Sequence, residues 1–323
     1  MLLTVIIPAH KAAEHVFRAL DSAAAIDFPT EILLVENGSV ELEGLEWPKD
    51  SIHHYRYLNS GAADLSRARN HGLAHAGGEF VFFLDADDEV LSAEFSEAVR
   101  SLVALRGDLL MFPSRDLGRS SRRARAASRT VVRRFPSGAR LAEWCLVRVS
   151  FTANAGVRVV RRALLIRHFS GFREGAFHED HYYAFVVHAV AGVSLHVNRP
   201  LHLRHRSSTS ITATISQRES KRGYEKALAD IEAISPVLAA PASAEHRAAA
   251  VMLARFQIAY LKVSRWGQPG GAFLSEMKLL RARLVFALRW SAAVVLGATN
   301  SGASIYSARE LPNARGYGSS AQD

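Results

Sequence analysis

The chain has 323 residues, of which 49% are hydrophobic and 22% are charged. This composition is typical of a folded globular chain and excludes a wholly disordered or collagen-like one. The length is about twice the usual size of a single domain, which favours one large domain with a smaller appendage. The single cysteine, Cys145, excludes an internal disulfide and a zinc finger built from thiolates.

An apolar run at 2–7 follows Met1 directly, without the basic stretch and cleavage site that are typical of a signal peptide. Together with the single cysteine, this start predicts a cytoplasmic protein. The 40 Lys and Arg residues against 31 Asp and Glu residues give a formal net charge of +9. Such a charge favours anionic partners, among them nucleic acids, anionic lipid surfaces and nucleotide phosphates, without choosing between them.

Short apolar runs alternate with helical-period segments in the first part of the chain. This alternation predicts an α/β fold with a mostly parallel sheet that is covered by helices on both faces. The predicted strands are 2–7, 31–35, 52–58, 79–84 and 109–113, and the first predicted helix is 12–25. Periodic structure resumes near 141, continues through 157–165 and 182–191, and reaches a further predicted strand at 194–198.

The segment 114–134 interrupts this pattern with eight arginines among serines and alanines and with one acid, Asp116. It predicts a mobile basic loop, which is either a solvated surface insertion or an anion-binding loop over a substrate or near lipid.

After a polar run at 207–214 the composition becomes helical, which places a boundary near residue 215. We therefore expect a catalytic part at 1–215, a helical C-terminal extension at 216–299 and a flexible tail at 300–323. Arginines interrupt the apolar stretch 277–297, so it is shorter than the roughly 20 residues that a membrane-spanning helix needs. It is interpreted either as a helix packed on the protein core or as a helix lying on a membrane surface.

A buried strand at 79–84 leads directly into three acids, Asp85, Asp87 and Asp88. Ligands of open α/β sheets bind at this end of the strands. Clustered carboxylates favour a compensating cation, and oxygen ligands suit Mg²⁺ or Mn²⁺ shared with substrate phosphates. The same pattern also fits an acid that caps the next helix, a role open to Asp88.

Six motifs occur in the order seen in family 2 glycosyltransferases, and the chain resembles that family over about residues 2–210. They are TVIIPAH at 4–10, VENGS at 35–39, 59–61 followed by ARNHGL at 68–73, AGGE at 76–79, DADD at 85–88, and ED at 179–180. The resemblance implies a GT-A fold, in which a nucleotide-sugar half at about 1–113 joins an acceptor half at about 135–215.

The resemblance also implies roles for the residues at the first two strand ends. Pro8 and Ala9 would line the nucleotide pocket with backbone groups. Glu36 stands where the family usually has an aspartate that hydrogen-bonds the base, and Asn37 replaces a second aspartate. Arg69 would lie close to the donor diphosphate or sugar, because a guanidinium suits phosphate oxygens. An ion pair between Arg69 and the acidic cluster is the alternative.

By the same resemblance, Asp85 would contact the ribose or the donor sugar, and Asp87 would bind the divalent metal, Mn²⁺ or Mg²⁺. The pair Glu179 and Asp180 matches the acidic motif of the family, with Asp180 as the general base. Acids in the first turn of a helix also favour the helix dipole without any catalytic role, which is the alternative for this pair.

Histidines near 202–206 stand where some relatives supply a metal ligand. His205 is the residue assigned to that role, and His202 is its competitor. A structural role for either histidine is the alternative.

A single base opposite a metal-held leaving group predicts direct displacement with inversion. The expected reaction moves a sugar from a nucleoside-diphosphate donor, UDP-sugar, to a hydroxyl of a glycan or lipid-linked glycan in polysaccharide biosynthesis. The basic charge would bring the enzyme to the inner face of an anionic membrane.

Two other function classes compete with this expectation. A nucleotidyltransferase is disfavoured because 8–11 has no glycine-rich phosphate loop. A nucleic-acid-binding protein is disfavoured because the basic loop has no interleaved aromatic residues, and no nucleic acid is expected as a partner.

Overall fold

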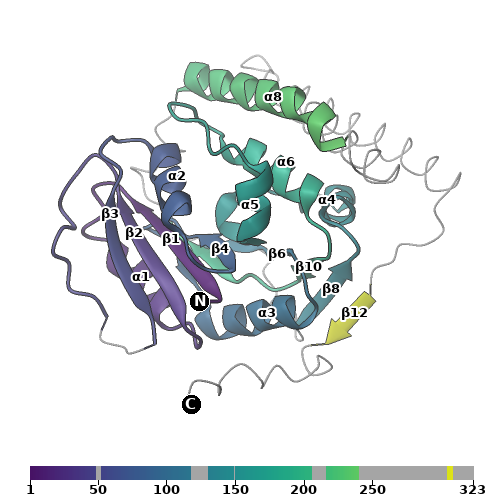
Figure 1. The fold of residues 1–323 in the computed structure, drawn as a ribbon, viewed down its shortest axis with the longest axis horizontal. Coiled ribbons are helices and arrows are strands. Elements are labelled where there is room, and N and C mark those ends of the chain that lie inside the picture. The colour runs from purple at the N-terminus through teal and green to yellow at the C-terminus, as the bar shows by residue number, and fades with distance from the viewer. Residues whose placement is uncertain (49–51, 118–129, 149, 206–215, 240–303, 308–323) are drawn as a thin grey trace, which may run out of the picture.

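A computed structural model describes residues 1–48, 52–117, 130–148, 150–205, 216–239 and 304–307 (Figure 1). The helices are α1 (Val16–Ala24), α2 (Leu65–His75), α3 (Ser92–Ala104), α4 (Gly138–Val147), α5 (Arg162–His168), α6 (Asp180–Val190) and α8 (Gln217–Ala239). The strands are β1 (Leu3–Ala9), β2 (Thr30–Glu36), β3 (His54–Asn59), β4 (Phe80–Phe83), β5 (Glu89–Val90), β6 (Leu109–Met111), β7 (Ser114–Asp116), β8 (Val131–Phe135), β9 (Arg158–Arg161), β10 (Ser194–Val197), β11 (His202–Arg204) and β12 (Ser304–Ser307).

The central sheet has nine strands in the order β12-β8-β10-β6-β9-β4-β1-β2-β3. Strands β1, β2, β3 and β4 pair in parallel, and β6 pairs in parallel with β10. Within the part of the chain that the structure describes, β8 and β9 run opposite to the other seven strands. The predicted α/β fold on a mostly parallel sheet is confirmed.

Helices cover both faces of this sheet, as the strand pattern predicts. Every residue of β1 and β2 is buried, which is typical of parallel strands that are covered on both sides. One core joins these strands to α1 and α3 through residues such as Leu20 and Phe95. The other joins them to α2, α4 and α6 through residues such as Ala68, Leu141 and Tyr183.

A second, three-stranded sheet has the order β5-β11-β7. Strand β11 pairs antiparallel with β5 and in parallel with β7. Because β5 follows the acidic run 85–88 directly, this small sheet fixes the acidic turn against the later part of the chain.

Helix α8 begins the predicted C-terminal extension and packs over α6 (Figure 1). It starts with a capping box, in which the Ser216 hydroxyl accepts from the Glu219 N–H and the Glu219 carboxylate accepts from the Ser216 N–H. Ala227 and Ile231 are buried on its inner side. The stretch 240–299, which includes the membrane candidate 277–297, lies outside the described residues. In the described ranges no helix is both long and apolar enough to cross a bilayer.

Two predictions are wrong in part. The expected basic loop 114–134 contains strand β7 at its start and the beginning of β8 at its end, because β7 pairs with β11 and β8 pairs with β10. Its middle, 118–129, lies outside the described residues. The expected flexible tail 300–323 contains strand β12, which pairs antiparallel with β8. Both corrections arise from pairing with distant strands, which the local sequence does not reveal.

Candidate active site

The carboxyl ends of β1 and β2 form one wall of the candidate site. Ala9 and Glu36 are partners in register, and the N–H of Asn37 donates to the Ala9 carbonyl over 2.8 Å. His10 Nδ1 donates to the Asn37 carbonyl over 2.5 Å. The structure therefore brings the predicted nucleotide-lining residues Pro8, Ala9, Glu36 and Asn37 together at one edge of the sheet.

The Glu36 carboxylate is buried and hydrogen-bonded at both oxygens within the protein. Oε1 accepts from the Ser39 hydroxyl (2.6 Å) and the Glu41 N–H (2.8 Å), and Oε2 accepts from the Tyr57 hydroxyl (2.7 Å) and the Leu42 N–H (3.2 Å). Burial alone would raise the pKa of Glu36, but these hydrogen bonds outweigh it and lower the pKa. The four bonds use the acceptor capacity of a carboxylate. Contact of Glu36 with the nucleotide base stays a prediction. A base would have to compete with these four donors for the carboxylate oxygens.

The acidic run after β4 forms a turn in which the Asp88 N–H donates to the Asp85 carbonyl over 3.0 Å. Its three carboxylates have different surroundings. Asp85 forms an ion pair with Arg69 at 2.9 Å. The buried Asp88 carboxylate accepts from the backbone N–H of His205 and lies 3.1 Å from His202 Nε2. Among the described residues, the Asp87 carboxylate has no partner in another side chain.

The pKa values of Asp85 and Asp87 are shifted in opposite directions. Burial raises the pKa of Asp87 to about 6, and the neighbouring charges of Asp88 and Asp85 add to this effect. Burial would raise the pKa of Asp85 as well, but the charge and hydrogen bond of Arg69 outweigh it and lower the pKa. Arg69 therefore neutralises the charge of Asp85. Asp87 forms no ion pair among the described residues, and the charge of His15 and a backbone hydrogen bond oppose the rise of its pKa only in part.

Arg69 joins this turn to the N-terminus of α6. Its guanidinium is buried and donates to Asp85 Oδ1 over 2.9 Å and to Glu179 Oε1 over 2.7 Å. Although burial alone would lower it, the charges of Asp85 and Glu179 raise the pKa of Arg69. The structure thus shows the alternative that the sequence left open, an ion pair with acidic residues. Contact of Arg69 with donor phosphates stays a prediction.

Glu179 and Asp180 stand at the start of α6, and only Glu179 is buried. Burial raises the pKa of Glu179 to about 8, and the charge of Asp180 acts in the same direction, while Arg69 opposes both. The pair therefore combines one buried carboxyl that is held by Arg69 with a second acid that is only partly buried. Arg69 and Glu179, which are in contact here, are separated by 110 residues along the chain.

The predicted metal ligands do not converge. His205 Nε2 lies 2.8 Å from Glu89 Oε1, so this ring faces Glu89 rather than Asp87. Over the described ranges, no group of three His, Cys, Asp or Glu side chains is placed to hold a metal ion. The unpartnered Asp87 carboxylate does fit a cation that takes its remaining ligands from phosphates and water, which is how Mg²⁺ is commonly held.

Sequence reasoning missed two arginines around the acidic turn. Arg204 of β11 lowers the pKa of Asp85 through its charge, as does His202, which the sequence marked only as a candidate metal ligand. Arg18 of α1 donates to the Asp87 carbonyl over 3.4 Å. No motif marks the two arginines, because they reach the turn only through the pairing of β11 with β5 and the packing of α1.

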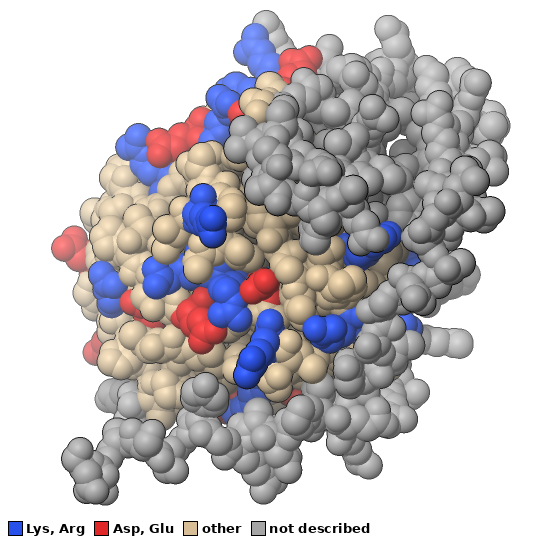
Figure 2. All heavy atoms as spheres, turned by 45° about the vertical axis from the view of Figure 1, so that its right-hand side comes forward, with Lys and Arg blue, Asp and Glu red and all other residues tan. Residues whose placement is uncertain are grey.

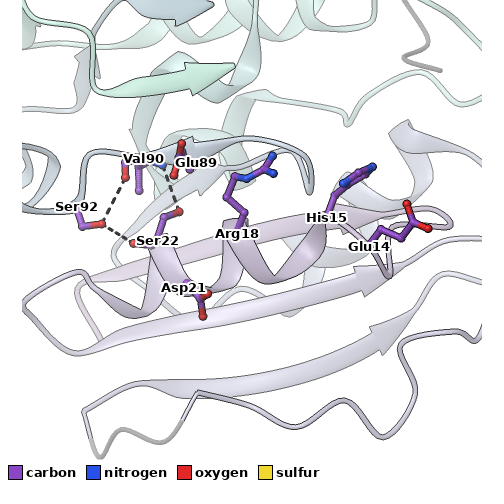
Figure 3. A pocket seen from close by; sticks show the side chains of 8 residues that line it. All are labelled: Glu14, His15, Arg18, Asp21, Ser22, Glu89, Val90 and Ser92. Carbon is purple, nitrogen blue, oxygen red and sulfur yellow. Dashed lines mark hydrogen bonds between the residues drawn. The ribbon is translucent and has the colours of Figure 1, made fainter. Parts of the chain in front are cut away.

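A hollow of about 560 Å³ opens beside this turn (Figure 3). It is lined by Glu14, His15, Arg18, Asp21, Ser22, Glu89, Val90 and Ser92. Arg18 projects from α1 and His15 stands at the N-cap of this helix, as Figure 3 shows. The Ser22 hydroxyl accepts from the Val90 N–H over 3.2 Å, and the Ser92 hydroxyl donates to the Ser22 carbonyl over 2.7 Å. These bonds tie α1 to the strand that follows the acids.

Charge on the surface is mixed. On the face shown in Figure 2, acidic side chains gather near the middle of the described surface and basic side chains border them. The formal net charge of +9 is therefore not spread as a uniformly basic surface over the described part of this face.

The model of the family "Glycosyl transferase family 2" matches residues 4–179, which is more than half of the chain. The chain belongs to glycosyl transferase family 2. The match covers the strand ends, the acidic turn and Glu179, so the family resemblance that the motifs predicted is confirmed, and with it the class of enzyme.

Two curated glycosyltransferases match a shorter segment. The uncharacterized glycosyltransferase YibD of Escherichia coli (strain K12) is 32% identical over 110 residues, which are 33% of this chain and 31% of YibD. The glycosyltransferase GlyA of Streptococcus pneumoniae serotype 4 is 28% identical over 110 residues, which are 33% of this chain and 16% of GlyA. The aligned segment thus spans less than a third of either relative.

Among solved structures, residues 1–349 of Staphylococcus aureus TarS match with a TM-score of 0.61 and 17% identity. The match covers 87% of this chain and 79% of that chain. At this identity the likeness concerns the fold, and it confirms the GT-A architecture of this family 2 member.

Proposed function

We propose that this family 2 member is an inverting, metal-dependent glycosyltransferase that moves a sugar from a nucleoside-diphosphate donor to a hydroxyl of a glycan or lipid-linked glycan. The observation that carries the proposal is the bridge from Asp85 through Arg69 to Glu179. It joins the acidic turn at the strand ends to the acids at the start of α6. A donor diphosphate and an acceptor hydroxyl require these two groups of acids in one site.

The donor side of the reaction uses the acidic turn. Asp87 would bind a divalent cation together with the donor phosphates, and when bound the cation neutralises charge on the departing diphosphate. Asp85, held by Arg69, is placed to accept hydrogen bonds from the ribose or the sugar. Pro8, Ala9 and Asn37 would line the nucleotide from the neighbouring strand ends.

The acceptor side uses α6. Asp180 would take the proton of the acceptor hydroxyl as the hydroxyl oxygen attacks the anomeric carbon. The bond from that carbon to the diphosphate oxygen breaks on the opposite face of the sugar, so the configuration inverts. Glu179 does not act as a second base in this scheme, because its oxygen is bonded to Arg69.

UDP-sugar is the proposed donor. The matched TarS structure is a complex with UDP-GlcNAc, and TarS is named a poly(ribitol-phosphate) β-N-acetylglucosaminyltransferase. The amide of Asn37 suits uracil, because it both accepts and donates hydrogen bonds. We further propose that His205 supports the acidic turn through Glu89. We also propose that the enzyme takes a peripheral position at the inner membrane face, where a lipid-linked acceptor would lie.

Nucleotide titration tests this function. UDP, GDP, dTDP and CDP are titrated calorimetrically with and without Mn²⁺ into the wild-type protein, Asp87→Ala and, as a matched control, Glu97→Ala on the exposed side of α3. We expect UDP to bind only with Mn²⁺, and Asp87→Ala but not Glu97→Ala to abolish that binding. Binding of none of the nucleotides would overturn the proposed function.

A further inference from the structure

The segment 170–179, which leads into Glu179 and Asp180, is held from one side by α2. The Asn70 amide brackets Phe172, donating to its carbonyl over 2.8 Å and accepting from its N–H over 2.7 Å. The Asp64 carboxylate, which caps α2, also accepts from the Gly175 N–H over 2.6 Å. The first half of the segment is therefore fixed to the donor half of the molecule.

Helix α8 holds the same segment through further contacts. Arg173 makes a two-pronged ion pair with Asp230. Lys226 Nζ donates to the Gly175 carbonyl over 3.3 Å. Nearest to the acids, His178 Nε2 lies 2.9 Å from the hydroxyl of Ser220, which is itself buried. These contacts come from successive turns of one helix face.

At one point of this interface the backbone of α8 closely approaches the backbone of the segment 170–179. A Cβ at Gly223 would lie 2.4 Å from the carbonyl oxygen of Phe177. No larger residue fits there unless α8 or the segment moves. The absence of a side chain at Gly223 therefore sets how closely α8 approaches the residue before His178.

His178 has a backbone conformation that needs support. Its φ of +65° lies in the left-handed region, which is unfavourable for a residue with a β-carbon. Its carbonyl accepts from the His181 N–H over 3.2 Å, so this strained residue begins the first turn of α6. A change in its φ would rotate the N–H groups and carboxylates of that turn.

We propose that His178 is a positioning residue, held by Ser220 of α8 and by the close approach of Gly223 to the preceding Phe177, that fixes the orientation of Glu179 and Asp180 at the start of α6. The inference rests on the proposed function, in which Asp180 is the base. It assigns a role in the reaction to the C-terminal extension, which lies beyond the matched family segment 4–179.

Hydrogen exchange tests the positioning without any need for substrate. Ser220→Ala removes the partner of His178, Ser220→Thr keeps the hydroxyl, and Ala229→Ser on the exposed side of α8 is the matched control. We expect amides at 176–182 to exchange about tenfold faster in Ser220→Ala, with recovery in Ser220→Thr and no change in the control. Equal exchange in Ser220→Ala and wild type would overturn the proposal.

Kinetics then separates this inference from the proposed function. With UDP-GlcNAc as the probe donor, transfer to water is measured for wild type, Gly223→Ala and Ala229→Ser. We expect Gly223→Ala to lower kcat by about a hundredfold while the Kd for UDP is unchanged, because a displaced base costs rate rather than donor binding. A wild type that binds none of the nucleotides counts against the proposed function; an active wild type with an equally active Gly223→Ala counts against the positioning role alone.

Discussion

The two halves of the catalytic part obtain their site residues in different ways. In the donor half, the acids and the nucleotide-lining residues follow the ends of β1, β2 and β4, which are neighbouring parallel strands. In the acceptor half, β9 enters antiparallel between β4 and β6, and Glu179 and Asp180 follow an irregular segment that α2 and α8 hold. In the donor half the ends of parallel strands position the site residues. In the acceptor half contacts between residues far apart in the chain position them.

This difference predicts that the donor half binds the nucleotide and that the acceptor half places the base. Strand ends in a buried sheet are rigid, which suits the binding of a nucleotide in one fixed position. A helix start held by side-chain contacts on two sides depends on more residues, and each of them is a separate point at which the placement of the base can fail. We therefore expect changes in the donor half to act on binding and stability, and changes at α6 to act on the rate of transfer.

The largest expected effect comes from Asp180→Asn. The amide is isosteric but cannot take a proton, so we expect kcat to fall by about a thousandfold while the Kd for UDP stays within about twofold. Steady-state rates and calorimetry on the same preparation measure both. Glu97→Gln on α3 is the matched control and should keep full activity. A loss of UDP binding in Asp180→Asn would break the separation of the two halves.

Arg69→Met tests the bridge between the halves. It leaves Asp85 and Glu179 without their shared counter-charge, and breaking a buried ion pair costs about 3–5 kcal/mol. We expect urea unfolding to report a loss of about 3 kcal/mol. Arg67→Met, two residues away, removes an exposed pair with Glu174 and should cost less than about 1 kcal/mol. Equal losses in the two variants would mean that the bridge does not join the halves energetically.

The strands of the donor half were predictable, because short apolar runs stand at 2–7, 31–35, 52–58 and 79–84 and helical-period segments separate some of them. These runs correspond to β1, β2, β3 and β4 within two residues at each end. Strands β7, β8 and β12 were not predictable in the same way. Arg115, Arg133 and Arg134 mark the first two as basic surface, and only pairing with distant strands makes all three part of a sheet.

The site was predictable where a side chain follows a strand and was not where it depends on a tertiary contact. The position of Asp85 and Asp87 at the end of β4 follows from the sequence pattern. The enclosure of Glu36 does not, because its donors come partly from Tyr57 on β3. The support of His178 by Ser220 is equally invisible in the sequence, since 42 residues separate them.

Glu36→Gln sharpens the picture of the donor half. A glutamine has one acceptor oxygen where the carboxylate has two, so some of the four donors lose their partner, at a cost of about 1–3 kcal/mol. We expect lower stability in urea. We also expect weaker binding of UDP, with UDP still preferred over the other nucleotides. Glu41→Gln is the control, because this exposed neighbour contributes only its N–H to the turn. A changed base preference at unchanged stability would instead assign base recognition to Glu36.

In the acceptor half we expect a dependence of stability on pH. His188 is fully buried; its Nδ1 donates to the Gly138 carbonyl over 3.0 Å, and its Nε2 accepts from Arg158 over 3.3 Å. Burial lowers the pKa of His188 to about 3, and the charge of Arg158 acts in the same direction. The unfolded chain therefore binds more protons between pH 6.5 and 3. The stabilising effect is present above pH 6.5 and is lost as the pH falls toward 3.

His188→Gln removes this titration while keeping an amide that can donate and accept. We expect the free energy of unfolding of the wild type to fall more steeply between pH 6.5 and 4, by up to about 1.4 kcal/mol per pH unit, than that of the variant. His54→Gln is the control, because this exposed side chain lies on β3, away from the buried network. Parallel pH profiles of wild type and His188→Gln would mean that the network at the far end of α6 accommodates a charge. The contacts that hold the acceptor half would then be looser than its burial implies.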